Sequence, residues 1–132
     1  MKHLLFIIVS MLIVGCSASN PYNDEKMYDL ASQFKDLSQT VDGAIKFGEV
    51  TIETGQQALE SVSVEQPDKV AHFAEYVIKV ELQGDNAVLL LCDDNIALIE
   101  DAGCNAVLDK VYWQVLNPNS CVITLDSHQL CK

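Results

Sequence analysis

Cysteine is the residue type in this sequence with the widest chemistry, and it occurs in two separate places. Cys16 stands alone, whereas Cys92, Cys104, Cys121 and Cys131 follow much later. These four contain no Cys-x-x-Cys pair, the spacing of thiol redox catalysts and of many zinc sites. Four thiols in an exported small domain would instead form two disulfides, each stabilising the fold by about 2–4 kcal/mol. Three pairings are open, and the favoured prediction is the sequential one, Cys92–Cys104 with Cys121–Cys131.

Histidine could supply a catalytic base, but neither downstream histidine has a visible partner. His72 lies between Ala71 and Phe73, and His128 lies close to the C-terminus, each outside any recognisable motif. The sequence also lacks Gly-x-Ser-x-Gly, His-Glu-x-x-His and a phosphate-binding glycine loop. We therefore expect no catalytic residue, no cofactor and no enzymatic activity.

The densest group of possible metal ligands follows the second strand-like stretch: Asp93, Asp94, Asn95, Glu100 and Asp101. A calcium loop alternates its oxygen ligands around a glycine turn. Here the glycine is missing and the hydrophobic segment 96–99 intervenes. If residues 93–95 form a hairpin turn, the carboxylates lie at opposite ends of a strand. The prediction is a solvated turn and no metal site.

The N-terminal segment has the layout of a secretory signal. Lys2 and His3 precede the apolar run Leu4–Val14, which only Ser10 interrupts. A short cationic start, an apolar run and a small residue before the break are typical of such signals. A transmembrane helix needs about 20 residues, so a membrane-spanning interpretation is disfavoured.

This run ends in the five residues Leu12-Ile13-Val14-Gly15-Cys16. They resemble the lipobox of bacterial lipoproteins, although Ala or Ser is commoner in the family pattern at the place of Val14. The resemblance implies removal of residues 1–15, a diacylglyceryl thioether on Cys16, and acylation of the new amino group, for example by palmitate. The alternatives are an ordinary signal peptide with an incidental cysteine, or a buried N-terminal strand.

The residues after Cys16 bear on where such a lipoprotein would reside. Two or more acyl chains hold a protein stably on a bilayer, whereas one chain binds marginally. Residue 17 is Ser17 and not Asp, the usual inner-membrane retention signal in Gram-negative lipoproteins. The resemblance therefore implies the outer membrane, facing the periplasm, ahead of the inner membrane or the cell surface. Residues 16–22 would be the lipidated cysteine and a short tether.

The charge balance narrows the choice of partners. The chain has 8 cationic and 19 acidic residues, a formal net charge of −11, and no arginine. Loss of Lys2 with the signal would take the charge from −11 to −12. Nucleic acid and anionic headgroups are poor partners for such a chain. A cationic envelope protein is permitted, and the sequence predicts no oligomeric state.

An apolar stripe with helical spacing begins after the tether. Its members are Met27, Leu30, Phe34, Leu37, Val41 and Ala44, and the same register continues through Gly48, Ile52, Gly55, Leu59 and Val62. Glycines and β-branched residues weaken helix propensity at 48–55. We expect two helices, or one helix bent there, capped by Asn23 or Asp24 and ending before Pro67. The stripe can cover the protein's own sheet, which we favour, or pair with a coiled-coil partner.

Three stretches further on have strand character. Residues 76–82 alternate between apolar and polar, as a half-buried strand does, and residues 87–92 are apolar on both faces, as in a central strand. Turn residues at 83–86 and 93–95 would join these to a third strand at 96–100. The expected arrangement is an antiparallel meander.

The C-terminal part is harder to assign. Segment 105–116 is compatible with a helix or a strand, and Trp113 within it is expected in the core beside the outward-facing Tyr112. Segment 121–125 predicts a short last strand.

These patterns together predict one α+β domain at 23–132, in which an N-terminal helix or bent helix pair packs on a small antiparallel sheet with two disulfides. The expected function is a membrane-anchored, periplasm-facing accessory lipoprotein that binds an envelope protein and is not an enzyme. The alternative is an acidic inhibitor or immunity protein that binds a cationic enzyme such as a cell-wall hydrolase. Binding carried by charge weakens as ionic strength rises, so salt dependence separates the two.

Overall fold

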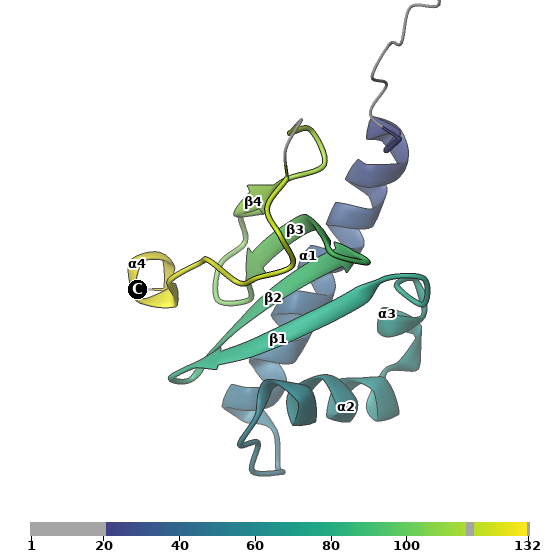
Figure 1. Cartoon of the computed structure of the whole chain (residues 1–132). Coiled ribbons are helices and arrows are strands. Elements are labelled where there is room, and N and C mark those ends of the chain that lie inside the picture. The colour runs from purple at the N-terminus through teal and green to yellow at the C-terminus, as the bar shows by residue number, and fades with distance from the viewer. Residues whose placement is uncertain (1–20, 116–117, 132) are drawn as a thin grey trace, which may run out of the picture.

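Helices pack on one face of a four-stranded antiparallel sheet, and the C-terminal segment covers the other face. The structure is a computed structural model that describes residues 21–115 and 118–131. In Figure 1, α1 lies behind the sheet and the yellow C-terminal segment lies on the viewer's side. The predicted α+β class, the antiparallel sheet and the two disulfides are confirmed. Cys16 and the signal segment lie outside the described residues.

The helical stripe forms two helices separated by a loop. α1 spans Asp24–Phe47 and α2 spans Gly55–Glu65. Asn23 caps α1, because its side chain accepts hydrogen bonds from the first N–H groups, and Thr54 forms a capping box at the start of α2. As predicted, α2 ends ahead of the proline, with which the short helix α3 (Pro67–Ala71) begins.

The apolar stripe of α1 belongs to the protein's own core. Its buried members are Met27, Leu30, Phe34, Leu37 and Val41. The Phe34 ring packs edge-on against Phe73 with 5.6 Å between ring centroids, and Val62 of α2 joins the same cluster. The predicted break near 48–55 is confirmed as the loop between the helices, in which Gly48 is exposed, while Gly55 and Val62 of the same register are buried in α2.

The first three strands of the sheet form the predicted meander, and a short fourth strand from the ambiguous segment is added beside the third. β1 (Val77–Gln83), β2 (Asn86–Asp93), β3 (Ile96–Ala102) and β4 (Lys110–Val111) are neighbours in that order. β2 is buried on both faces, as its sequence predicted, because α1 covers one face and residues of the C-terminal segment cover the other. β3 runs two residues beyond the predicted end at residue 100.

α2 begins directly against the backbone of β1. A Cβ atom on Gly55 would lie 2.0 Å from the carbonyl oxygen of Val80, so this close approach requires glycine.

The ambiguous segment 105–116 contains the two-residue strand β4, and Trp113 just after it is 2% exposed. The core assignment of Trp113 is therefore confirmed.

The predicted strand at 121–125 is wrong. This segment is extended but belongs to no strand, and the nearest sheet-like contact is a single bridge between Ile96 and Ser120. The reason is that the segment crosses the face of the sheet and does not lie beside an edge strand. The N–H groups of Thr124 and Leu125 therefore bind the Glu100 side chain of β3. The short helix α4 (Ser127–Leu130) follows.

The predicted sequential disulfide pairing is also wrong. The bridges are Cys92–Cys121 and Cys104–Cys131, with Cα–Cα distances of 5.9 and 5.6 Å. Cys92 lies by the β2–β3 turn, whereas Cys104 follows the far end of β3. A strand of 7 residues spans roughly 20 Å, well beyond the limit of about 7 Å between bridged Cα atoms. Each bridge instead joins the sheet region to the C-terminal segment.

Candidate functional site

The histidines are not brought together into a site. His72 follows α3 and is exposed, with its ring centroid 6.4 Å from that of Phe73. His128 is exposed in α4, and Figure 1 shows α3 and α4 at opposite ends of the sheet. The geometry does not assemble a histidine-based catalytic centre from these two residues.

The acidic cluster divides into an exposed turn and a buried pair. Asp94 and Asn95 form the exposed β2–β3 turn, where Asp94 has a φ of 54°, a left-handed conformation that Asp tolerates. Glu100 and Asp101 are fully buried in β3. Within residues 21–115 and 118–131, no group of three His, Cys, Asp or Glu side chains could hold a metal ion.

Glu100 binds the C-terminal segment to the sheet. Its Oε1 accepts the backbone N–H groups of Thr124 and of Leu125, the latter at 2.6 Å. Its Oε2 accepts the Tyr112 hydroxyl at 2.6 Å and the Thr124 hydroxyl at 2.9 Å. Burial, followed by the hydrogen bond to Glu100, raises the pKa of Tyr112. Because both carboxylate oxygens are occupied by protein donors, this arrangement serves structure.

Asp101 makes the corresponding connection on the helix face. Its oxygens accept Lys35 Nζ at 3.0 and 3.2 Å and the N–H of Asp109 at 3.3 Å. Lys35 also donates to the carbonyl oxygen of Ala102 and to Asn105 Oδ1. Burial raises the pKa of Asp101 to about 6, although Lys35 acts in the opposite direction. This network ties α1 to the end of β3.

The sequence contained a signal for these buried carboxylates that was missed. Consecutive residues of a strand point to opposite faces, and β3 extends through Glu100 and Asp101 to Ala102. The two carboxylates must therefore lie on opposite faces of the sheet, one toward the helices and the other away from them.

Tyr22 connects the start of α1 to the end of β2. Its hydroxyl donates to Asp93 Oδ2 at 3.0 Å. Burial, followed by that hydrogen bond and the charge of Asp93, raises the pKa of Tyr22 to about 12. The shift disfavours the phenolate form that a nucleophilic role would require.

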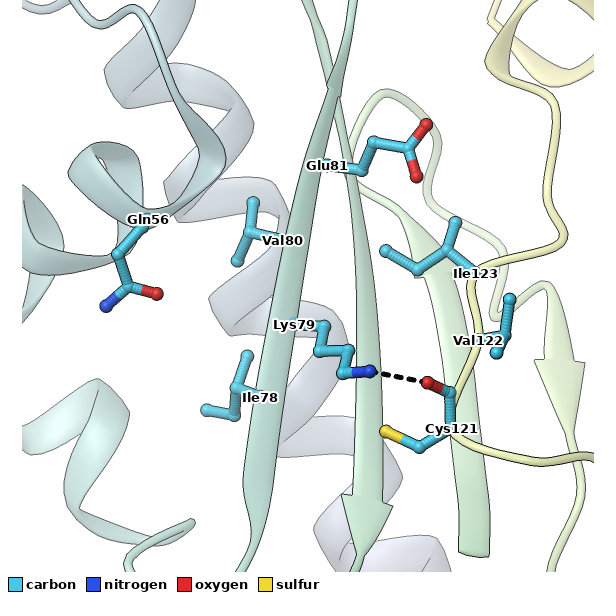
Figure 2. A pocket seen from close by; sticks show the side chains of 8 residues that line it. All are labelled: Gln56, Ile78, Lys79, Val80, Glu81, Cys121, Val122 and Ile123. Carbon is cyan, nitrogen blue, oxygen red and sulfur yellow. Dashed lines mark hydrogen bonds between the residues drawn. The ribbon is translucent and has the colours of Figure 1, made fainter. Parts of the chain in front are cut away.

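A groove of about 400 Å³ runs along β1, and Figure 2 shows its lining. Ile78 and Val80 point toward the side of α2, whereas Lys79 and Glu81 point toward the C-terminal segment. Lys79 Nζ donates to the carbonyl oxygen of Cys121 at 2.7 Å, so its charge holds that segment in place. Exposed charges on an edge strand discourage pairing with other chains, and we assign the groove no chemistry.

Exposed acidic residues outnumber exposed lysines on the surface that the structure describes. All 19 acidic residues lie in the described part of the chain. Several lysines are engaged by the protein itself, in the ion pairs Lys35–Asp101, Lys46–Asp42 and Lys69–Asp36. Each pair neutralises one lysine and one carboxylate, so the excess of carboxylates over lysines is unchanged.

Comparisons with protein-family models, with curated proteins and with solved structures found no match to this chain. None of the helices in the described ranges is both long enough and apolar enough to cross a bilayer.

Proposed function

We propose that this chain is a lipid-anchored protein of the bacterial cell envelope that binds another protein and catalyses no reaction. The observation that carries the proposal is Cys16, which ends the apolar N-terminal segment in a sequence that resembles a lipobox. Lipid on Cys16 would hold the protein on the outer membrane, facing the periplasm. The two disulfides support this placement, because disulfides persist in oxidising compartments.

Two structural observations support binding in preference to catalysis. The buried carboxylates Glu100 and Asp101 are engaged by donors of the protein itself and are poor candidates for acid–base work. The surplus of carboxylates over lysines creates a field that attracts cationic surfaces. A stable domain with a surplus of negative charge suits recognition of a cationic partner.

The anchor is tested by substituting its cysteine. Cys16→Ser should abolish incorporation of a radiolabelled fatty acid, because the thioether requires the sulfur atom. Ser17→Ala, a neighbouring change that keeps the thiol, should label like the wild type. Equal labelling of Cys16→Ser and wild type would refute the lipoprotein proposal.

Residue 17 provides a test of the membrane. Ser17→Asp introduces the usual inner-membrane retention signal of the family that the N-terminus resembles. Density-gradient separation of membranes should find the wild type with the outer membrane and the variant with the inner membrane. Wild-type protein in the inner-membrane fraction would contradict the proposed location.

A second candidate is an acidic inhibitor or immunity protein, and the observation in its favour is the excess of 19 acidic over 8 basic residues. Such a protein would block a cationic enzyme such as a cell-wall hydrolase. Equimolar full-length protein in detergent would then inhibit a cationic muramidase at low ionic strength and lose that effect at high ionic strength. Absence of inhibition would contradict the inhibitor role and favour the accessory binding role.

A further inference from the structure

The end of the molecule where α1 finishes exposes large apolar side chains. Phe47, the last residue of α1, is 85% exposed, and Val50 in the following loop is 66% exposed. Beside them, the α1–α2 loop and the β1–β2 turn enclose a groove of about 320 Å³. We call this the distal groove, and its lining includes Ile45, Val50, Ile52, Leu82, Glu49 and Asp85.

The distal groove has a well-supported apolar floor. Ile45 and Ile52 are partly buried and pack against the main core, which connects the groove to the stable part of the fold. The end of the loop is held as well, since Gln57 Oε1 accepts the N–H groups of Glu53 and Thr54 at 2.9 and 3.3 Å. The floor of the distal groove and the end of its loop are therefore held by the fold, beside the exposed Phe47 and Val50.

The charge around the groove is negative. Glu49 and Asp85 line it, and the nearby cation Lys46 is engaged by Asp42 at 2.7 Å and by Asn86 at 3.0 Å. The C-terminal end of α1 adds the partial negative charge of its last carbonyl groups. The apolar floor and the negative rim of the distal groove together fit a side chain with an aliphatic stem and a cationic head.

We propose that the distal groove receives a lysine or arginine side chain of a cationic partner protein, while Phe47 and Val50 pack on apolar surface beside that cation. Carboxylates pair strongly with guanidinium and ammonium groups, and the exposed ring of Phe47 can add a cation–π contact. Apolar anchors surrounded by charged groups are the usual anatomy of an interface centre. The inference rests on the proposed binding function and gives it a place on the molecule.

Charge argues against the other possible occupants. A second copy of this chain would bring 19 further acidic residues against 8 basic ones, so the two copies repel each other. Anionic lipid headgroups are repelled in the same way. A metal ion has too few ligands, because no metal-binding group of three occurs among the residues described.

The position of the groove fits an anchored protein. α1 has 24 residues and is therefore roughly 36 Å long. Figure 1 shows the α1–α2 loop and the β1–β2 turn toward the end of α1 that is far from its start. An anchor that precedes α1 would thus leave the distal groove directed away from the lipid surface.

The proposal is tested with a photo-cross-linking amino acid at position 47 of the full chain in its native envelope. The control carries the same amino acid at Val107, which is 68% exposed and lies in a different part of the molecule. We expect a cross-link from position 47 and none from position 107, with a lysine or arginine close to the partner's cross-linked residue. No cross-link at 47, or a cross-linked segment without lysine or arginine, would overturn the inference.

Charge neutralisation makes the test specific. Glu49→Gln with Asp85→Asn should lower the yield of the cross-link about tenfold, since each lost ion pair costs affinity. Glu65→Gln with Asp68→Asn removes two exposed carboxylates elsewhere and should leave the yield unchanged. Equal yields for both double variants would show that overall charge, and not this groove, recruits the partner.

A defined probe separates this inference from the proposed function. A synthetic peptide of alternating lysine and leucine should shift the NMR signals of Glu49, Thr51 and Asp85 in the full chain in micelles, whereas its glutamate counterpart should not. Shifts spread evenly over the acidic surface would overturn the groove and leave the anchored binding role intact. Failure of fatty-acid labelling at Cys16 would remove the anchor and leave the groove untouched.

Discussion

The two faces of the sheet are closed by different kinds of interaction. On one face, α1 and α2 bury an apolar cluster, and the ion pair between Lys35 and Asp101 lies at its margin. On the other face, a segment with little regular structure covers smaller apolar clusters. That segment is held by the Glu100 carboxylate, by Lys79 and by two disulfides.

The difference follows from how each covering element satisfies its backbone. A helix bonds its own N–H and C=O groups, so it needs only an apolar side to pack on a sheet. An extended segment that joins no strand needs outside partners for the same groups. Glu100 Oε1 accepts the N–H groups of both Thr124 and Leu125, and the disulfides supply the attachment that the small apolar area cannot.

The largest effect is expected on the helix face. Phe34→Ala should lower the free energy of unfolding by about 3–5 kcal/mol, because it leaves a cavity where a fully buried ring packs against Phe73. The matched control is Phe47→Ala at the exposed end of the same helix, which should leave stability nearly unchanged. Chemical denaturation of both variants measures the contrast. Comparable losses would mean that the helix face is not the main core.

The covalent attachment of the other face should come next. The bridge joins two cysteines that are 29 residues apart in the sequence. Replacing Cys92 and Cys121 by alanine should therefore lower the free energy of unfolding by about 3–4 kcal/mol. Hydrogen exchange should rise first in the C-terminal segment while α1 remains protected. Peptide mapping without reduction should recover Cys92 linked to Cys121, and a Cys92–Cys104 peptide would refute the bridge.

The hydrogen-bonded attachment is expected to contribute less. Glu100→Gln should cost about 2 kcal/mol, because an amide presents one acceptor oxygen where four donors converge. Amide exchange at Thr124 and Leu125 should accelerate. Glu81→Gln changes an exposed carboxylate on the same face and should have little effect. If the two variants behaved alike, Glu100 would not be what holds the segment.

The last expected effect is a pH dependence of stability on the helix face, small at any one pH step within the window. The pKa of Asp101 is raised from 3.8 to about 6, so the folded state holds a proton more tightly than the unfolded chain between these values. Its contribution to stability is therefore greatest below about pH 4 and is lost as pH rises through 6, on the order of 1 kcal/mol per pH unit at the steepest. Melts of wild type and Asp101→Asn across this window measure it. Parallel curves would contradict the shift.

Local patterns predicted the parts of the fold that local physics controls. The stripe from Met27 to Val41 became one buried side of α1, and the residues of β2, apolar on both faces, became the central strand. Both patterns report directly which side of an element avoids water. The strand predicted at 121–125 is wrong, because an apolar extended stretch has the same sequence pattern whether it pairs within a sheet or crosses the face of one.

The sequence by itself determined the start of α1 at its cap, the order of the first three strands and the even number of downstream cysteines, since each depends on neighbouring residues. Only the tertiary structure decided that Cys92 bonds Cys121, that Glu100 is buried and that Phe47 is exposed. These outcomes depend on which distant segment arrives at a given surface. The antiparallel register places Cys92 and Cys104 at opposite ends of β3, and the reach of a disulfide then excludes the pairing that proximity in sequence had favoured.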